Sequence, residues 1–204
     1  MIDFAKDAGC NAVKFQTLIT SEVMLKNTKL ISYQKSSGAK NMKNLIDKYN
    51  FSFEKFVKIK RYCDSKKIIF LSTPFDPKSA AFLNSLNVKA FKISSGDLNN
   101  FLLLKTIKKF KKPIILSTGM SRLPEIINTL KFLNLSKEKL AILHCVSDYP
   151  TKVKNTYLSN INSLIKLNKI VGFSDHTTGT ICAAAAISMG AKIIEKHITL
   201  NSNL

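Results

Sequence analysis

The stretch "IIFLSTPFDPKSAAFLNSL", residues 68–86, indicates how this chain folds. It begins with an apolar, partly β-branched run that ends in a polar tip at Ser72 and Thr73, which is typical of a strand buried on both faces. Asp76 followed by Pro77 is the usual pair of an N-cap and a first helical residue, and it precedes a segment of helical composition. The stretch therefore predicts one strand followed by one helix.

The same alternation recurs along the chain. Apolar runs with polar tips lie at residues 12–17, 68–74, 90–96, 113–119, 141–147, 170–176 and 193–200. After the first gap they recur every 20 to 30 residues or so, about the length of one βα unit in a barrel. Strands that are apolar on both faces and alternate with helices indicate a parallel sheet, in either a doubly wound fold or a (β/α)8 barrel.

The polar tips favour the barrel. Nearly every predicted strand ends in reactive side chains, from Lys14 in the first run to His197 in the last. In a barrel, such groups come from the ends of many strands and meet at one mouth, whereas a doubly wound sheet gathers its ligand groups at one switch point. The chain also lacks the GxGxxG and GxxxxGK[ST] motifs of nucleotide-binding folds. We therefore predict an α/β fold, a TIM barrel that forms a single domain over residues 1–204.

The net charge and the cysteine spacing indicate which partners and which cellular compartment to expect for this protein. A net charge of +19 first suggests nucleic acid, but the basic residues are mostly lysines spread over the predicted helices, and Arg61 and Arg122 are the two arginines. The four cysteines show no CxxC spacing, no apolar run is long enough to span a membrane, and the chain does not open on a signal-peptide pattern. We expect a cytoplasmic protein with neither nucleic-acid nor membrane partners. A DNA-binding protein is the alternative, and it would show salt-dependent association.

The residues near the strand tips suggest two kinds of site, a metal site and a phosphate site. His176 and His197 follow apolar runs, and imidazoles on neighbouring strands can bind a transition metal and leave it open to substrate. The alternative is that each histidine is structural. Lys14 and Lys92 lie inside apolar runs, where an ammonium group is costly without an anion. With strand-end serines they would form a phosphate site, although such serines also serve as simple helix caps.

Seven ordered motifs point to a known family. They are "AVKFQT", "FLSTPFD", "FKISSGD", "PIILSTGMS", "LHCVSDYPT", "VGFSDHTTG" and "GAKIIEKHITL". Together, from about residue 6 to residue 203, they resemble the sialic acid synthase family, which includes N-acetylneuraminate and legionaminic acid synthases. The resemblance implies a (β/α)8 barrel that condenses phosphoenolpyruvate with an N-acetylated hexosamine, N-acetylmannosamine first. It also implies a divalent metal, typically Mn²⁺, with Mg²⁺ and Co²⁺ as alternatives.

The resemblance further implies roles for individual residues. The positions that match metal ligands are His176 and His197. Those that match phosphoenolpyruvate-binding positions are Lys14, Lys92, Ser95, Ser117 and Ser174. Gln16 and Tyr149 match positions that touch the sugar, and Asp97, Asp175 and Glu195 match catalytic acidic groups. Full-length members are homodimers.

The motifs also depart from the family pattern. Members begin with one more strand and continue through a last helix into a C-terminal antifreeze-like domain, and none of these has a counterpart in residues 1–204. We therefore expect an incomplete barrel that lacks its first strand and last helix. A truncated, inactive remnant or a ligand-binding fragment is the alternative function. The motifs favour the neuraminate and legionaminate types over the pseudaminate type without specifying the hexosamine.

The segment between Thr17 and Asn50 is longer than an ordinary βα loop. It would lie beside the mouth of the barrel, where it could cover a substrate. The alternative is a surface elaboration with one helix near residues 42–50. The abundance of lysine, asparagine and isoleucine indicates an AT-rich bacterial genome.

Overall fold

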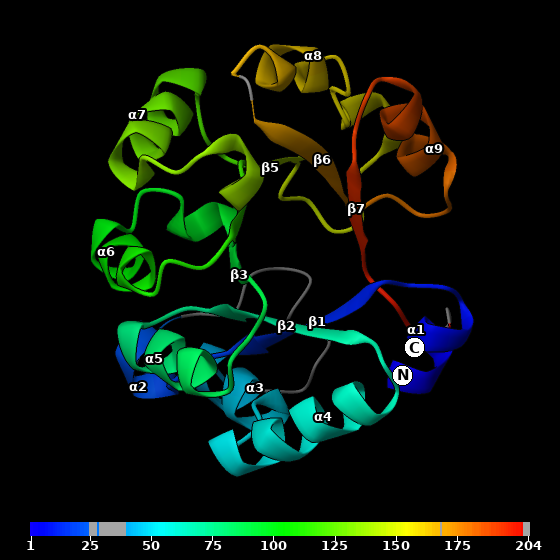
Figure 1. The fold of residues 1–204 in the computed structure, drawn as a ribbon. Helices are drawn as coiled ribbons and strands as arrows, with labels where there is room; N and C mark the ends of the chain where they lie inside the picture. The colour runs from blue at the N-terminus through cyan, green and yellow to red at the C-terminus, as the bar shows by residue number, and fades with distance from the viewer. Residues whose placement is uncertain (25–27, 29–39, 168, 202–204) are drawn as a thin grey trace.

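Seven parallel strands form the centre of the computed structural model, which describes residues 1–24, 28, 40–167 and 169–201. The strands are β1 (Ala12–Thr17), β2 (Ile69–Pro74), β3 (Phe91–Ile93), β4 (Ile114–Ser117), β5 (Leu140–Cys145), β6 (Ile170–Asp175) and β7 (Ile193–Lys196). β1 pairs with β2, and β3 to β7 form a second sheet in sequence order. Because β2 lies beside β3, the two sheets continue one another as a curled half-barrel (Figure 1).

All seven predicted strands are present, and two of them end three or more residues before their apolar runs do. The run at 90–96 ends as a strand at Ile93 because residues Ser95–Asp97 form a 3-10 helix, η2. The run at 193–200 ends as a strand at Lys196. In both cases the polar tip is not part of the strand, so its side chains lie on the turn that follows.

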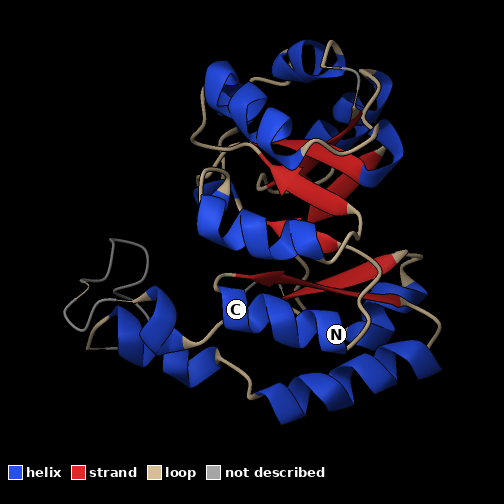
Figure 2. Cartoon of the chain, turned by 60° about the vertical axis from the view of Figure 1, so that its left-hand side comes forward, coloured by secondary structure: helices blue, strands red, loops and turns tan. Residues whose placement is uncertain are grey.

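Helices surround the strands on the outside of the curl (Figure 2). They are α1 (Ile2–Asp7), α2 (Thr20–Val23), α3 (Met42–Tyr49), α4 (Phe53–Ser65), α5 (Pro77–Ser85), α6 (Phe101–Lys109), α7 (Leu123–Leu133), α8 (Asn160–Ile165) and α9 (Ile181–Ser188). The predicted N-cap is confirmed: Asp76 accepts a hydrogen bond from the backbone N–H of Ser79. The Ser52 hydroxyl accepts one in the same way from that of Lys55 at the start of α4. Short 3-10 turns η3 (Lys137–Lys139) and η4 (Val153–Asn155) complete the described elements.

The hydrophobic core lies between the strands and the helices. Phe70, Phe91 and Phe173 point outward from their strands and are almost fully buried. Phe15 stacks on Phe70 with ring centroids 5.6 Å apart, and Phe56 of α4 packs edge-on against both rings. Each such ring contributes roughly 1.5–3 kcal/mol through burial. Since side chains alternate along a strand, the residues next to these phenylalanines face the interior of the curl.

The close approach of two strands explains why residue 172 is a glycine. A Cβ added to Gly172 in β6 would lie 2.6 Å from the Leu143 side chain and would also overlap the Ile193 backbone in β7. Any other residue would push β6 and β7 apart. Gly172 thus permits the close approach of the two strands whose ends carry His176 and His197.

The described strands curl without closing. β1 pairs only with β2, and β7 only with β6, within the described part of the chain. This agrees with the expected incomplete barrel. A complete eight-stranded barrel is not seen among these residues.

The long segment after β1 is tied together at its two ends. The Asn50 side-chain amide donates to the Leu18 carbonyl oxygen at 3.0 Å, and the Thr20 hydroxyl donates to Asp47 of α3 at 2.7 Å. α3 confirms the helix predicted near residues 42–50. The predicted substrate-covering role falls largely on residues 25–27 and 29–39, which lie outside the described residues. Among the helices that are described, none has the length and apolar character needed to cross a membrane.

Candidate active site

Charged side chains from distant parts of the sequence meet inside the curl. The Lys92 ammonium nitrogen, on β3, donates to the Ser117 hydroxyl on β4 at 2.7 Å. It also lies 3.4 Å from Glu195 Oε1 on β7. The Ser174 hydroxyl on β6 donates to the same carboxylate oxygen at 2.8 Å. From β1, the Lys14 ammonium lies 3.9 Å from Glu195 Oε2. Five strands therefore contribute to one polar cluster.

The two lysines differ in burial. The Lys92 side chain is 5% exposed, as the apolar run around it predicted, whereas the Lys14 side chain is 26% exposed. Lys14 is more open because β1 has a strand partner on one side only within the described residues. The sequence predicted that both ammonium groups would be buried among the strands. Lys92 is buried in this way, and Lys14 is buried in part.

Burial and charge shift the ionisation of this cluster. Burial lowers the pKa of the Lys92 ammonium, and the Glu195 carboxylate opposes that shift. Burial alone would raise the pKa of Glu195, but the Lys92 and Lys14 charges and the Ser174 hydroxyl outweigh it, so its pKa lies below the ordinary value. Two cationic groups thus face one carboxylate, which makes the interior suited to an anion that carries further negative charge.

A backbone N–H and two more hydroxyls lie beside the cluster. The Gly119 N–H, just after β4, donates to the Ser95 hydroxyl at 2.9 Å. A Cβ on Gly119 would lie 2.6 Å from the Ser147 hydroxyl oxygen and 2.9 Å from that of Ser95. Sequence reasoning missed both Gly119 and Ser147. The signal that could have found them is their position at the tips of the fourth and fifth predicted strands, within motifs already singled out.

The two predicted metal ligands lie side by side. His176 directly follows β6 and His197 directly follows β7, and their ring centroids are 5.5 Å apart. The His176 Nδ1–H donates to the Val146 carbonyl oxygen at 2.7 Å, which leaves Nε2 with its lone pair. Burial lowers the pKa of both imidazoles. Both are therefore neutral near pH 7, which is the form that binds metals.

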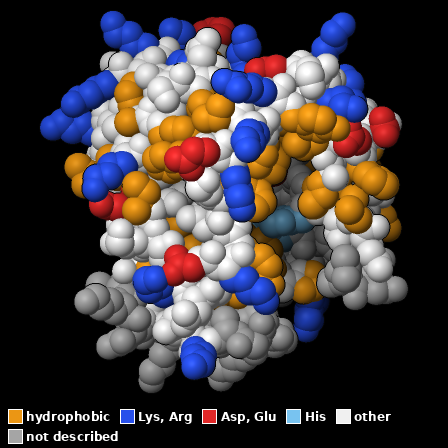
Figure 3. Space-filling model, turned by 90° about the horizontal axis from the view of Figure 1, so that it is seen from below, with side chains coloured by type: hydrophobic (Ala, Val, Ile, Leu, Met, Phe, Trp, Pro, Cys, Tyr) orange, Lys and Arg blue, Asp and Glu red, His pale blue; other side chains and the backbone are white. Residues whose placement is uncertain are grey.

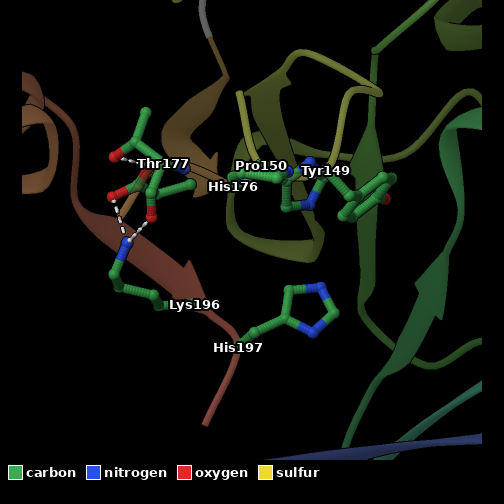
Figure 4. A pocket seen from close by; sticks show the side chains of 7 residues that line it. Tyr149, Pro150, His176, Thr177, Lys196 and His197 are labelled. Atoms are coloured by element: carbon green, nitrogen blue, oxygen red, sulfur yellow. Dashed lines mark hydrogen bonds and ion pairs between the residues drawn. The ribbon is translucent and has the colours of Figure 1, made fainter. Parts of the chain in front are cut away.

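A pocket of about 230 Å³ opens at this pair. Its lining residues are Tyr149, Pro150, Asp175, His176, Thr177, Lys196 and His197. The Tyr149 ring lies 4.1 Å from the His176 ring and 5.7 Å from the His197 ring, centroid to centroid. Figure 4 shows the two imidazoles and Tyr149 on one side and Lys196 with its partners on the other. In Figure 3, a histidine is visible deep in a hollow bordered by hydrophobic side chains.

The two imidazoles could supply two nitrogen ligands to a metal ion. Within the described ranges no group of three or more His, Cys, Asp or Glu side chains is arranged to hold a metal ion. The remaining coordination positions would fall to water or to substrate oxygens. Imidazole nitrogen suits Mn²⁺, Co²⁺ and Zn²⁺ better than Mg²⁺, so the residues present fit a transition metal.

Three predicted site residues stand apart from the cluster. The Asp97 carboxylate accepts hydrogen bonds from Ser94 and Asn100 within its own turn, at 2.6 and 3.0 Å. Asp175 is held by Thr177 and Lys196. Gln16 is exposed, on the same face of β1 as Lys14. Their catalytic and sugar-binding roles stay predictions.

The third histidine has a different environment. His144 is buried, its Nε2 lies 2.6 Å from the Thr156 carbonyl oxygen, and its ring stacks on Phe173. Because His144 is paired with the outward-facing Phe173 in the sheet register, it lies on the outer face of the curl. It is a structural residue, and it shows why the strand-tip position alone does not identify a ligand.

Comparison with known proteins identifies the family. The model of the NeuB family matches residues 1–204, and the chain belongs to this family. This confirms the resemblance found in the seven motifs. An uncharacterized protein of Methanocaldococcus jannaschii is 38% identical over 206 residues, which cover 100% of this chain and 58% of that protein. The N,N'-diacetyllegionaminic acid synthase of Campylobacter jejuni is 37% identical, with 100% of this chain and 63% of the enzyme covered.

Solved structures show the same relationship. The N-acetylneuraminic acid synthetase of Leptospira borgpetersenii, in complex with citrate, superposes with a TM-score of 0.87 at 34% identity, over 98% of this chain and 67% of that one. The spore coat polysaccharide biosynthesis protein SpsE of Bacillus subtilis gives a TM-score of 0.83 at 33% identity, over 100% and 55%. The chain spans about three fifths of the length of the curated relatives it matches.

Proposed function

We propose that this chain forms the catalytic core of a synthase that condenses phosphoenolpyruvate with an N-acetylated hexosamine, N-acetylmannosamine first, to give a nine-carbon sialic-type acid and phosphate. Membership of the NeuB family, whose relatives include legionaminic acid synthases, supports the reaction class. One observation carries the proposal for this chain: the buried Lys92, with Ser117 and Glu195, lies in the same interior as the His176 and His197 pair. An anion site would thus adjoin an open metal site.

The anion site would bind phosphoenolpyruvate. Its phosphate and carboxylate groups carry several negative charges, which the Lys92 and Lys14 ammonium groups would neutralise. The hydroxyls of Ser95, Ser117 and Ser174 would add charge-assisted hydrogen bonds, and the Gly119 N–H approaches the same space. Since these groups come from strand ends and turns held by the sheet, they are placed before the ligand arrives.

The imidazole pair would hold the metal, with Mn²⁺ as the first choice and Co²⁺ or Mg²⁺ as alternatives. When bound, a divalent metal supplies Lewis-acid polarisation of the sugar aldehyde. Tyr149, which packs on His176 and lines the pocket, would contact the sugar, and Gln16 would do so from β1. In the reaction, C3 of phosphoenolpyruvate bonds to the aldehyde carbon, water adds at C2, and the bond between C2 and the phosphate oxygen breaks.

Glu195 is suited to moving a proton in this reaction. Its pKa lies below the ordinary value, so it is ionised at neutral pH and can accept a proton from the water that adds at C2. Its contact with Ser174 holds the carboxylate in place, and Lys92 and Lys14 stabilise its charge. We assign it the role of general base.

Phosphate release tests the proposal. The purified chain is mixed with phosphoenolpyruvate, N-acetylmannosamine and Mn²⁺, and the released phosphate is compared with that from Lys92→Met. We expect little or no release by residues 1–204 alone, release by a version extended at both ends, and at least a tenfold loss when Lys92→Met is made in the extended version. Binding of phosphoenolpyruvate and Mn²⁺ without release by either version, with every N-acetylated hexosamine tried, would instead support the alternative of a ligand-binding fragment. Loss of both binding and release would contradict the assignment.

A further inference from the structure

We propose that Asp175 and Lys196 form a positioning pair that holds His176 and His197 against each other. Neither side chain touches the Glu195 cluster through any contact found in the structure, yet each directly precedes one of the two imidazoles in the chain. The inference rests on the proposed function in that the imidazoles are taken as metal ligands. It also removes Asp175 from the groups expected to meet the substrate and gives it a role through the histidines.

The sheet register places the pair on the outer face. β6 and β7 align Ser174 with Glu195 and Asp175 with Lys196. Because side chains alternate along a strand, Ser174 and Glu195 meet on the inner face, whereas Asp175 and Lys196 meet on the outer one. Two cross-strand contacts on opposite faces therefore join the strands, Ser174 with Glu195 two residues before the histidines and Asp175 with Lys196 one residue before them. Asp175 and Lys196 are the last residues at which β6 and β7 are paired.

The contacts of the pair bracket His176. The Lys196 ammonium donates to Asp175 Oδ2 at 2.8 Å and to the Thr177 carbonyl oxygen at 2.7 Å. Asp175 Oδ1 accepts hydrogen bonds from the Thr177 N–H at 2.8 Å and from its hydroxyl at 2.7 Å. Residues 175 and 177, on both sides of His176, are thus bound to each other and to the residue that precedes His197. Figure 4 shows this group beside the two imidazoles.

The Asp175 carboxylate of the pair is buried, so it depends on its counter-ion. The Asp175 side chain is 0% exposed and that of Lys196 is 29% exposed, so water cannot replace the ammonium at the carboxylate without a change in the surrounding structure. Loss of the Lys196 charge would leave Asp175 buried beside its own turn without this counter-ion. The turn that carries His176 would then move toward solvent, away from His197. The geometry of the imidazoles therefore depends on a contact at the edge of the pocket, separate from the Glu195 cluster.

The test compares three variants by two measurements. Lys196→Met removes the charge, Lys196→Arg keeps it, and Lys169→Met removes a comparable lysine at the opposite end of β6, where its ammonium donates to the Leu135 carbonyl at 2.7 Å. The first measurement, without metal, is the nuclear Overhauser effect between the ring protons of His176 and His197. The second is Mn²⁺ affinity from the electron paramagnetic resonance signal of free Mn²⁺.

We expect Lys196→Met to lose the ring contact and to bind Mn²⁺ about 10- to 100-fold more weakly, as is typical when a residue that orients a metal ligand is removed. Lys196→Arg should restore most of both. Lys169→Met should keep both, even if its melting temperature falls. A folded Lys196→Met chain that keeps the ring contact would overturn the inference.

The two proposals can fail separately. If the parent chain does not bind Mn²⁺, the metal arm of the proposed function fails, while the metal-free ring contact still decides the role of the pair. If circular dichroism shows that Lys196→Met is unfolded, Asp175→Asn replaces it, since this change removes the charge but keeps an oxygen for Thr177. Retention of the ring contact in folded Asp175→Asn would then contradict the inference, and its loss would support it.

Discussion

The Lys92 ammonium nitrogen and the Ser117 hydroxyl oxygen lie 2.7 Å apart, on adjacent strands inside the curl. The contact joins a buried cation to a neutral acceptor, and Glu195 lies 3.4 Å from the same nitrogen. The same nitrogen also donates to the Ile93 carbonyl oxygen at 3.4 Å, so two of its three contacts are long. An incoming anion could replace these long contacts with shorter, charge-assisted ones.

Replacement of Lys92 by methionine should weaken phosphoenolpyruvate binding by about 10- to 100-fold, which corresponds to the loss of one charged hydrogen bond. The measurement is isothermal titration with phosphoenolpyruvate. Lys60→Met is the matched control because it breaks an ion pair with Asp64 within the outer helix α4. Equal affinity in parent and Lys92→Met would place the anion elsewhere.

Replacement of either His176 or His197 by alanine should abolish Mn²⁺ binding measured by calorimetry. In the proposed metal site each imidazole would supply one of two nitrogen ligands, so a single removal would leave one. His144→Gln is the control, since that histidine lies on the outer face against Phe173. Unchanged affinity in the His176 and His197 variants, or equal loss in the control, would sink the ligand assignment.

A methyl group at Gly119 should weaken anion binding without unfolding the chain. In Gly119→Ala the Cβ would lie 2.6 Å from the Ser147 hydroxyl oxygen and 2.9 Å from that of Ser95, so the hydroxyls must move. Gly96→Ala is a close control because its nearest neighbour would be 3.9 Å away. The affinity of each variant for phosphoenolpyruvate and for inorganic phosphate is measured by competition between the two. Similar affinities in the two variants would show that the space around Gly119 is not used.

Acid should destabilise the fold in two steps. Burial lowers the pKa of His144, so the unfolded chain takes up a proton at this residue before the folded chain does. The resulting stability is present above the ordinary value of 6.5 and is lost as pH falls through the folded pKa. The pKa values of Glu195 and Asp175 are also lowered, so their contribution is present above the ordinary values of 4.5 and 3.8 and is lost at lower pH.

Urea unfolding between pH 7.5 and pH 3 measures this dependence. In His144→Gln the first decline in the free energy of unfolding, just below pH 6.5, should be smaller, because one of the histidines with a lowered pKa is gone. The decline at lower pH should stay. An identical pH profile in parent and variant would show that His144 does not contribute.

Much of the site could be predicted because its residues lie toward the carboxyl ends of the predicted strands. The strand at residues 12–17 was predicted to the residue, and Lys14, Lys92, Ser117, Ser174 and Glu195 do meet. Their convergence follows from the parallel arrangement, which brings the carboxyl ends of all strands to one edge. Roles beyond this contact came from the family resemblance and remain for experiment.

The sequence by itself determined the alternation of strands and helices, the cap at Asp76, and the strand ends that carry the histidines. These depend on local composition and on side-chain periodicity. Only the tertiary structure decided that Asp175 turns away to Lys196, that Asp97 bonds within its own turn, and that His144 is structural while His176 lines the pocket. The reason is physical: the face on which a strand-end side chain emerges depends on register and on the path of the following turn, and both depend on neighbouring strands far away in sequence.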